Sequence, residues 1–183
     1  MRKLSMGELN RISKEEFERA EKTPIIIILD NIRSLSNVGA FFRTADAFRV
    51  EALYLCGITA CPPHREIHKT ALGADETVSW RYFETTEAAC QALMDEGYKI
   101  FAVEQIEGST SLEDFQFEPR TAYILGNEVD GVREEALPYC VGAIELPQEG
   151  TKHSINVSVC AGIVMWEAFK TLRHEKQNKA SMP

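Results

Sequence analysis

Hydrophobic runs alternate with amphipathic segments along the chain, and this alternation predicts the secondary structure. Residues 24–30 form a continuous apolar run that ends at Asp30, which is typical of a strand buried on both faces of a parallel sheet. Residues 37–48 then carry apolar side chains at helical spacing, with Asn37 as the expected N-cap. The apolar run at residues 51–56 predicts the next strand.

The alternation continues toward the end of the chain. Further strands are expected over residues 77–83, 98–104, 120–126 and 142–147. Further helices are expected over residues 85–97, near 133–140, and from Ser154 to about Glu175. Strands that alternate with helices predict an α/β fold with a largely parallel sheet flanked by helices. In such a sheet, ligands bind beyond the carboxyl ends of the strands.

The length and composition fit one soluble domain. The chain has 183 residues, of which 44% are apolar and 26% charged. We expect residues 1–22 to add an N-terminal helix, residues 23–176 to form the domain and residues 177–183 to be a flexible tail. No apolar run approaches the roughly 20 residues that span a bilayer, and the N-terminus lacks the apolar core of a secretory signal. A cytoplasmic protein without a membrane partner is therefore expected.

The cysteines and the net charge argue against several function classes. The five cysteines are widely spaced, with no C-x-x-C, so neither a zinc site nor a disulfide framework is expected. The formal net charge of −8 argues against a broad nucleic-acid-binding surface. Residues 64–69 nevertheless hold two His, one Arg and one Lys against one Glu. They form either a local basic patch or a solvated loop, and charge alone favours the loop.

Three segments at predicted strand ends combine glycines with polar residues: "NVGAFFRTADAF" (37–48), "LGNEVDGV" (125–132) and "LPQEGTKHSINVS" (146–158). Each has an ordinary explanation by itself, namely tight helix–sheet packing at Gly39, a strand-to-helix turn, and a helix cap. Arg43 beside an apolar face is harder to explain without an anionic partner. Because all three lie where an α/β site is built, their coincidence indicates a functional site.

Taken together, these segments resemble the three ordered motifs of the SpoU/TrmH family, the RNA ribose 2′-O-methyltransferases of the SPOUT superfamily. The likeness covers about residues 20–175, and Asn-x-Gly-x-x-x-Arg-Thr-Ala together with Ser-Ile-Asn-Val-Ser is highly specific. The chain departs from the family pattern at Arg49, where Gly is usual, and at Gln148 in the third motif. These departures concern substrate contacts more than the chemistry.

The resemblance implies a fold, a cofactor and an assembly. The implied fold is SPOUT-type, with a C-terminal trefoil knot whose loops form the S-adenosylmethionine pocket. By motif position, this pocket involves Val103, Glu104, Gly126, Leu146 and Ile155. A missing Cβ at Gly126 would let the adenosine approach the backbone. Family members work as homodimers with sites at the interface, and no metal is expected.

The final predicted helix bears on this assembly. One stripe of the helix consists of Ile155, Val159, Ile163 and Trp166, and other apolar residues lie off that stripe. The first half of the helix is therefore apolar nearly all round, so it is covered on most sides. The cover is either the rest of the same subunit or a second copy of the chain.

The implied activity is methyl transfer to a ribose 2′-OH of tRNA or rRNA, with tRNA favoured. The implied catalytic residues are Arg43, Asn37, Glu128, Ser154 and Asn156. An arginine has a pKa above about 12 and is a poor base. We therefore expect Arg43 to orient the ribose and stabilise the developing alkoxide, while the other four hold it in place. His153 is the rival base.

A basic rim is expected to hold RNA phosphates, formed by Arg33, Arg65, Lys69 and Lys152. The residues before Pro24 suffice for one helix only, so target recognition is expected to rest on the catalytic domain and its dimer. A non-catalytic RNA-binding or cofactor-binding module of the same fold is the alternative. A different α/β nucleotide-binding enzyme has less support, because neither G-x-G-x-x-G nor G-x-x-x-x-G-K-[ST] occurs.

Overall fold

Seven strands form one parallel sheet in the order β3-β2-β1-β6-β4-β7-β5. The computed structural model describes the backbone of residues 1–5 and 7–180 and the side chains of residues 1–5 and 7–178. The expected α/β fold with a largely parallel sheet is confirmed. The strands are β1 (Thr23–Asp30), β2 (Val50–Cys56), β3 (Trp80–Phe83), β4 (Lys99–Val103), β5 (Thr110–Ser111), β6 (Thr121–Leu125) and β7 (Gly142–Glu145).

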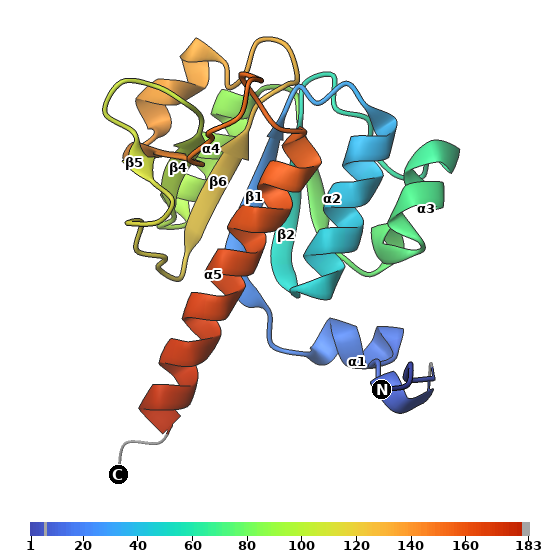
Figure 1. Cartoon of the computed structure of the whole chain (residues 1–183). Helices are drawn as coiled ribbons and strands as arrows, with labels where there is room; N and C mark the ends of the chain where they lie inside the picture. Colours follow the sequence, from blue (N-terminus) through green and yellow to red (C-terminus); the bar gives the residue numbers. More distant parts are fainter. Residues whose placement is uncertain (6, 181–183) are drawn as a thin grey trace.

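Helices cover both faces of this sheet (Figure 1). One face packs against α2 (Leu35–Ala47) and α5 (Val157–Ala180), and α3 (Arg65–Ala71) packs against α2. The opposite face packs against α4 (Thr86–Asp95) and the 3-10 helix η3 (Glu134–Tyr139). The remaining short elements are η1 (Gly7–Leu9), α1 (Lys14–Arg19) and η2 (Ala74–Glu76).

Strand β1 shows why helices are needed on both faces of the sheet. Ile25, Ile27 and Leu29 point into the cluster that contains α2 and α5, whereas Ile26 and Ile28 point into the cluster that contains α4. All five side chains are at most 2% exposed. Complete burial of each such side chain contributes about 1.5–3 kcal/mol. The run of four isoleucines is therefore explained by a strand with apolar layers on both sides.

Asp30 ends β1 and is fully buried. Its carboxylate accepts hydrogen bonds from Thr86 Oγ1 at 2.5 Å and from the backbone N–H of Arg133 at 2.8 Å. These hydrogen bonds compensate for the burial of the Asp30 carboxyl group. They also fix the start of α4 and the loop after β6 relative to β1. The carboxyl edge of the sheet is thereby held in one arrangement.

Two helices begin at residues other than those expected. Helix α2 begins at Leu35, because Ser34 Oγ accepts the backbone N–H of Asn37 at 3.3 Å and is the N-cap. Helix α5 begins at Val157 rather than near Ser154, because Asn156 Oδ1 accepts the backbone N–H of Ser158 at 2.9 Å. Asn37 thus lies inside its helix, where its carboxamide is available for other contacts.

Other boundaries also differ from the predictions. Strand β3 begins only at Trp80, the two-residue strand β5 was not expected, and the short helix before β7 is 3-10 and contains Pro138. Gly39 is explained by packing against α3 rather than against the sheet, since a Cβ there would lie 2.5 Å from the carbonyl oxygen of Ile67. Arg49 adopts a φ of +49°, which explains why Gly suits this position.

Helix α1 and the later part of α5 contact other parts of the chain. Phe17 of α1 is 4% exposed and belongs to the cluster of α2 and α5, and Lys176 pairs with Glu21. Helix α5 continues to Ala180, so residues 177–180 of the expected tail are helical, and residues 181–183 lie outside the described residues. Within the part of the chain that is described, no helix is long and apolar enough to cross a membrane.

Candidate active site

A cleft of about 530 Å³ lies at the carboxyl ends of β4, β6 and β7. All five residues that the sequence assigned to the cofactor line it, namely Val103, Glu104, Gly126, Leu146 and Ile155. Small-molecule sites typically have volumes of about 300–1,000 Å³ and combine apolar walls with a few polar groups. The cleft therefore has the size and the position of a ligand site in an open α/β sheet.

Gly126 is required by the loop that follows β6. A Cβ at Gly126 would lie 1.9 Å from the backbone carbon of Gly131 and 2.1 Å from the backbone nitrogen of Val132. The loop closes on itself, because Asn127 and Gly131 exchange two backbone hydrogen bonds of 3.1 Å. The missing Cβ therefore first makes room for this loop, and the expected approach of adenosine to the Gly126 backbone stays a prediction. The protein's own backbone fills that space.

Glu104 holds the same loop from β4. Its Oε2 accepts the backbone N–H of Val132 at 3.1 Å, and its Oε1 accepts that of Gln105 at 2.9 Å. Gly131 has a φ of +71°, and a Cβ there would lie 2.3 Å from Glu104 Oε2. Glu104 thus fixes the wall of the cleft as well as lining it.

Cys160 of α5 also lines the cleft. Burial raises the pKa of its thiol to about 11, so the thiol stays protonated at neutral pH. Because the thiolate is the nucleophilic form of cysteine, Cys160 contributes an apolar wall rather than a nucleophile.

Asn37 connects all three motif segments. Its side chain donates from Nδ2 to Glu128 Oε1 at 2.8 Å. Its Oδ1 accepts from Asn156 Nδ2 at 3.2 Å and from Ser158 Oγ at 3.4 Å. Asn37 is only 9% exposed, so these partners satisfy a nearly buried carboxamide. The start of α2, the loop after β6 and the start of α5 are therefore tied at one residue.

Glu128 is an ionised member of this network. Burial raises the pKa of its carboxyl, but the hydrogen bonds from Asn37 and from nearby backbone N–H groups outweigh burial, so the pKa is lowered overall. One of these donors is the backbone N–H of Arg33, at 3.4 Å from Oε2. A carboxylate is therefore present beside the cleft at neutral pH.

Ser158 belongs to the network, although the sequence did not single it out as a site residue. Its Oγ donates to Asn156 Oδ1 at 2.6 Å. The signal was the spacing of two between Ser154, Asn156 and Ser158, but its meaning depended on where α5 begins. Ser154 and His153 line the cleft, and among the described residues the side chain of neither forms a hydrogen bond.

Arg43 is not brought into the cleft of its own chain. It lies six residues beyond Asn37 on α2, which is about 9 Å along the helix axis. The side chain is exposed, and it forms no hydrogen bond or ion pair within the residues that the structure describes. The expectation that Asn37, Glu128, Ser154 and Asn156 hold Arg43 is therefore not met within one chain, because these residues bind one another or face the cleft.

Comparison with known proteins connects this geometry to a family. The SpoU rRNA Methylase family matches residues 24–166, most of the chain and all three motif segments. The chain belongs to this family. A 23S rRNA (guanosine-2′-O-)-methyltransferase of Neisseria meningitidis is 31% identical over 170 residues, which are 91% of this chain and 68% of that protein.

Two further comparisons agree with membership of the SpoU family. A tRNA (guanosine(18)-2′-O)-methyltransferase of Thermus thermophilus is 30% identical over 161 residues, which are 88% of this chain and 82% of that protein. The solved structure of an AdoMet-bound rRNA methyltransferase from Sinorhizobium meliloti superposes with a TM-score of 0.77 at 23% identity. That match covers 85% of this chain and 60% of the other, and it shows the shared fold.

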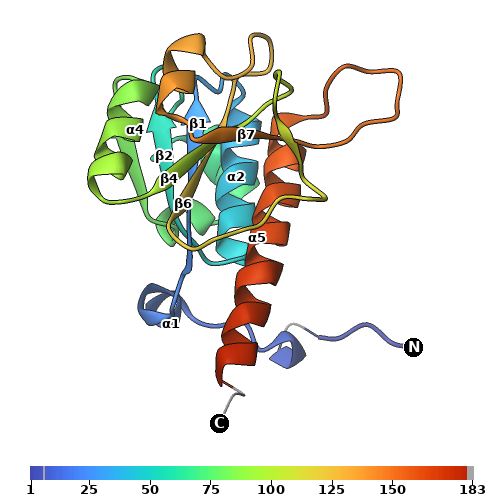
Figure 2. The same cartoon turned by 90° about the vertical axis from the view of Figure 1, so that its left-hand side faces the viewer.

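The four basic residues expected to bind RNA do not form one rim in this SpoU family chain. Arg33 lies beside the cleft, with its Nη2 3.7 Å from Oδ2 of the cleft residue Asp130. Lys152 directly precedes the cleft residue His153, in a loop that projects from the body (Figure 2). Arg65 and Lys69 lie on α3, on the far side of α2 (Figure 1). The described residues contain no group of three or more His, Cys, Asp or Glu placed to hold a metal ion.

Proposed function

We propose that this SpoU family chain transfers a methyl group from S-adenosylmethionine to a ribose 2′-OH of tRNA or rRNA. The observation that carries the proposal is the network of Asn37, Glu128 and Asn156 beside the 530 Å³ cleft. Two relatives are named for 2′-O-methylation of guanosine, one in 23S rRNA and one in tRNA. Of the two RNA classes, we propose tRNA as the substrate.

The cleft fits S-adenosylmethionine, which supplies an electrophilic methyl group when bound. Val103, Leu146 and Ile155 offer apolar walls for the adenosine, and the structure of the S. meliloti relative contains AdoMet. Glu104 lines the cleft and Glu128 is ionised at neutral pH, so both suit the positive charge of the methyl donor. Gly126 supports the cofactor indirectly, by allowing the loop after β6 to close.

The remaining chemistry concerns the ribose. Its 2′-OH must lose a proton as the oxygen forms a bond to the methyl carbon, while the bond between that carbon and the sulfur of the donor would break and S-adenosylhomocysteine would leave. We assign Arg43 to the negative charge that develops on this oxygen, because a guanidinium stays protonated and presents a planar set of donors. Asn37, Asn156 and Ser158 keep Glu128 oriented at the cleft. The proton passes to solvent at the open mouth of the cleft, with His153 as the rival acceptor.

The chain is proposed to work as a homodimer. Three residues of the stripe predicted from the sequence lie on α5 and are exposed, namely Val159 at 55%, Ile163 at 38% and Trp166 at 46%. The fourth, Ile155, precedes α5 and lines the cleft. The residues of α5 that face the sheet are instead buried, namely Ala161, Val164, Met165 and Ala168. A contiguous exposed apolar stripe on a long helix suits a protein interface.

Arg43 lies close to this stripe. Helices α2 and α5 are neighbours, since the rings of Phe48 and Trp166 are 5.6 Å apart and a Cβ at Gly162 would lie 3.8 Å from Thr44. Arg43 directly precedes Thr44 on α2. A second copy that covers the stripe would therefore approach Arg43. We infer that Arg43 serves the cleft of the second copy, which explains why it has no partner among the described residues of its own chain.

Arg33 and Lys152 flank the cleft and are assigned to phosphates next to the target nucleotide, whereas Arg65 and Lys69 are assigned to a more distant part of the RNA. The trefoil knot and a cytoplasmic location stay part of the proposal. Its test is a comparison of nucleosides from the RNA of a wild-type strain and of a strain that lacks the gene. Loss of one 2′-O-methylnucleoside supports the enzyme, and an unchanged set favours the non-catalytic module.

A further inference from the structure

A second cleft, of about 520 Å³, lies between α3 and the edge strand β3. The cofactor cleft is built from the ends of β4, β6 and β7, whereas β3 is the strand at the other edge of the sheet, so the two clefts are separate. It is lined by eight residues, namely Pro62, Pro63, His64, Arg65, His68, Asp75, Glu76 and Trp80. The activity proposed above does not use it.

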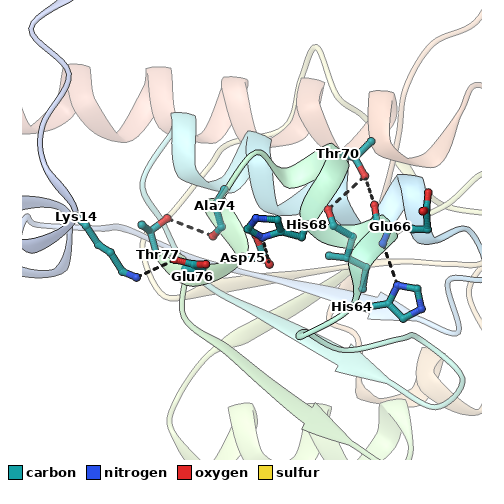
Figure 3. Close-up of polar contacts among 10 residues, drawn as sticks. Lys14, His64, Glu66, His68, Thr70, Ala74, Asp75, Glu76 and Thr77 are labelled. Atoms are coloured by element: carbon teal, nitrogen blue, oxygen red, sulfur yellow. Dashed lines mark hydrogen bonds and ion pairs between the residues drawn. The ribbon is translucent and has the colours of Figure 1, made fainter.

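Both carboxylates of this cleft already have cationic or hydrogen-bonding partners (Figure 3). Asp75, whose side chain is 5% exposed, has both carboxylate oxygens 3.1 Å from His68 Nδ1. Glu76 Oε2 is 3.2 Å from Lys14 Nζ. Arg65 is exposed and has no ion pair within the described part of the chain. The guanidinium of Arg65 is therefore the uncompensated charge at the cleft.

The hydrogen bonds of the two histidines indicate which ring nitrogens can meet a ligand. His64 Nδ1 accepts the backbone N–H of Glu66 at 3.2 Å, so in the neutral ring the proton is on Nε2. His68 Nδ1 faces the Asp75 carboxylate and carries a proton, which leaves Nε2 unused. The cleft thus offers the Nε2–H donor of His64, Nε2 of His68 and the donors of Arg65.

Trp80 and the two prolines add flat apolar surfaces. Trp80 is the first residue of β3 and is half-buried. Unpaired nucleotides are recognised by aromatic side chains that stack on the base, together with Arg groups and polar groups at the base edge. A purely structural role explains why His68 binds Asp75, since that bond ties α3 to η2. It does not explain why Arg65, His64 and Trp80 face the same volume.

We propose that this cleft binds one unpaired nucleotide of the RNA substrate, with the base against Trp80 and the phosphate against Arg65. The unused Nε2 atoms of His64 and His68 meet polar groups of the base or ribose. This inference rests on the proposed function, because it takes RNA as the substrate. It places a recognition contact away from the reacting ribose and assigns Arg65 a defined ligand.

The direct test uses protein labelled with 5-fluorotryptophan. The chain has two tryptophans, so two ¹⁹F resonances are expected, and Trp80→Phe identifies that of Trp80. Adding nucleoside 5′-monophosphates or a short single-stranded RNA should shift the Trp80 resonance in a saturable way. This readout needs no methyl transfer, so it stands even if the proposed activity fails. A Trp80 resonance that does not move up to the highest soluble RNA concentration would overturn the proposal.

Kinetics give the second test. Trp80→Leu and Arg65→Ala should each raise KM for RNA about tenfold, in line with the loss of one stacked base or one phosphate contact, while kcat and S-adenosylmethionine affinity stay unchanged. Trp80→Phe should retain most of the RNA affinity because it keeps a ring. Lys99→Ala, which removes a positive charge at the start of β4, is the matched control. Equal effects of Lys99→Ala and Arg65→Ala, or no effect of Arg65→Ala, would contradict the cleft assignment.

Discussion

Asn37 and Glu128 lie 91 residues apart in the sequence, and the structure joins them by a 2.8 Å hydrogen bond from Nδ2 to Oε1. The same carboxamide accepts from Asn156 through Oδ1. Asn37 therefore donates a hydrogen bond to the second motif segment and accepts one from the third. A carboxylate of the same shape could accept from Asn156 but could not donate to Glu128.

The first prediction concerns this pair. Asn37→Asp places two carboxylates in contact and should lower the stability of the protein by about 1–3 kcal/mol, the cost of losing a nearly buried hydrogen bond. Adding Glu128→Gln to that variant places an amide at position 128, which can donate to the new carboxylate at position 37. The hydrogen bond is then restored with donor and acceptor exchanged. Thermal unfolding of the two single variants and the double variant measures the coupling.

The double variant should recover a large part of the stability that Asn37→Asp loses. Methyl transfer should stay low in both variants that carry Glu128→Gln, because that change removes the charge of Glu128 at the cleft. A double variant whose stability loss equals the sum of the two single losses would mean that the hydrogen bond does not couple these residues.

The second prediction concerns pH. Hydrogen bonds lower the pKa of Glu128 in the folded protein, so the carboxylate contributes stability above its unfolded pKa of about 4.3, and that contribution is lost as pH falls through the folded pKa. The free energy of unfolding of the wild type should exceed that of Glu128→Gln by a constant amount above about pH 5, and this difference should shrink below about pH 4. Melting curves of both proteins across that interval give the answer. A difference that grows as the pH falls would contradict this prediction.

The third prediction concerns Gly126. Gly126→Ala forces a Cβ into the backbone of Gly131, so the loop after β6 must move, at a cost of about 1–3 kcal/mol or more. Both the melting temperature and S-adenosylmethionine affinity should fall. Gly150→Ala is the matched control, because a Cβ at Gly150 has nothing within 4 Å. If Gly126→Ala weakened cofactor binding without lowering stability, the clash would be with the cofactor and not with the loop.

Strand and helix types followed from the sequence because their periodicities differ. The four isoleucines of residues 25–28 required apolar layers on both sides, and the structure has them. Helix starts were less predictable, since several capping residues compete. Ser34 and Asn37 can both cap a helix, and only tertiary contacts of Asn37 with Glu128 and Asn156 decide which one does.

The candidate site was predictable as a set of segments but not as a set of contacts. Family resemblance supplied residues such as Gly126 and Ile155 that line the cleft. It did not supply the reason for Gly126, which depends on a chain reversal five residues later. Ser158 was missed because its role appears only when α5 begins at Val157.

The fourth prediction concerns Arg43 and the dimer. If Arg43 serves the cleft of a second copy, subunits with Arg43→Ala and subunits with Glu128→Gln should each be inactive alone. Mixing them by co-refolding should restore about a quarter of wild-type activity, because about half of the dimers are mixed and one of their two sites is intact. If Arg43 acted in its own chain, no mixed dimer would hold an intact site, and no activity would return.

The exposed stripe of α5 provides the contrast for that experiment. Trp166→Glu puts a charge into the proposed interface and should yield monomers by sedimentation, with loss of methyl transfer. His174→Glu, at an exposed position further along α5, should leave the dimer intact. A Trp166→Glu protein that remains dimeric would move the interface elsewhere.

Methyl transfer with a deuterated donor tests the central claim most directly. Purified protein is incubated with S-adenosylmethionine that carries a CD₃ group and with unmodified tRNA or rRNA, and the nucleosides are analysed by mass spectrometry. We predict a CD₃-labelled 2′-O-methylnucleoside with the wild-type protein and none with Arg43→Ala, although that variant still folds and binds the cofactor. A label on a base instead of the ribose, or no label in either RNA despite cofactor binding, would contradict the account.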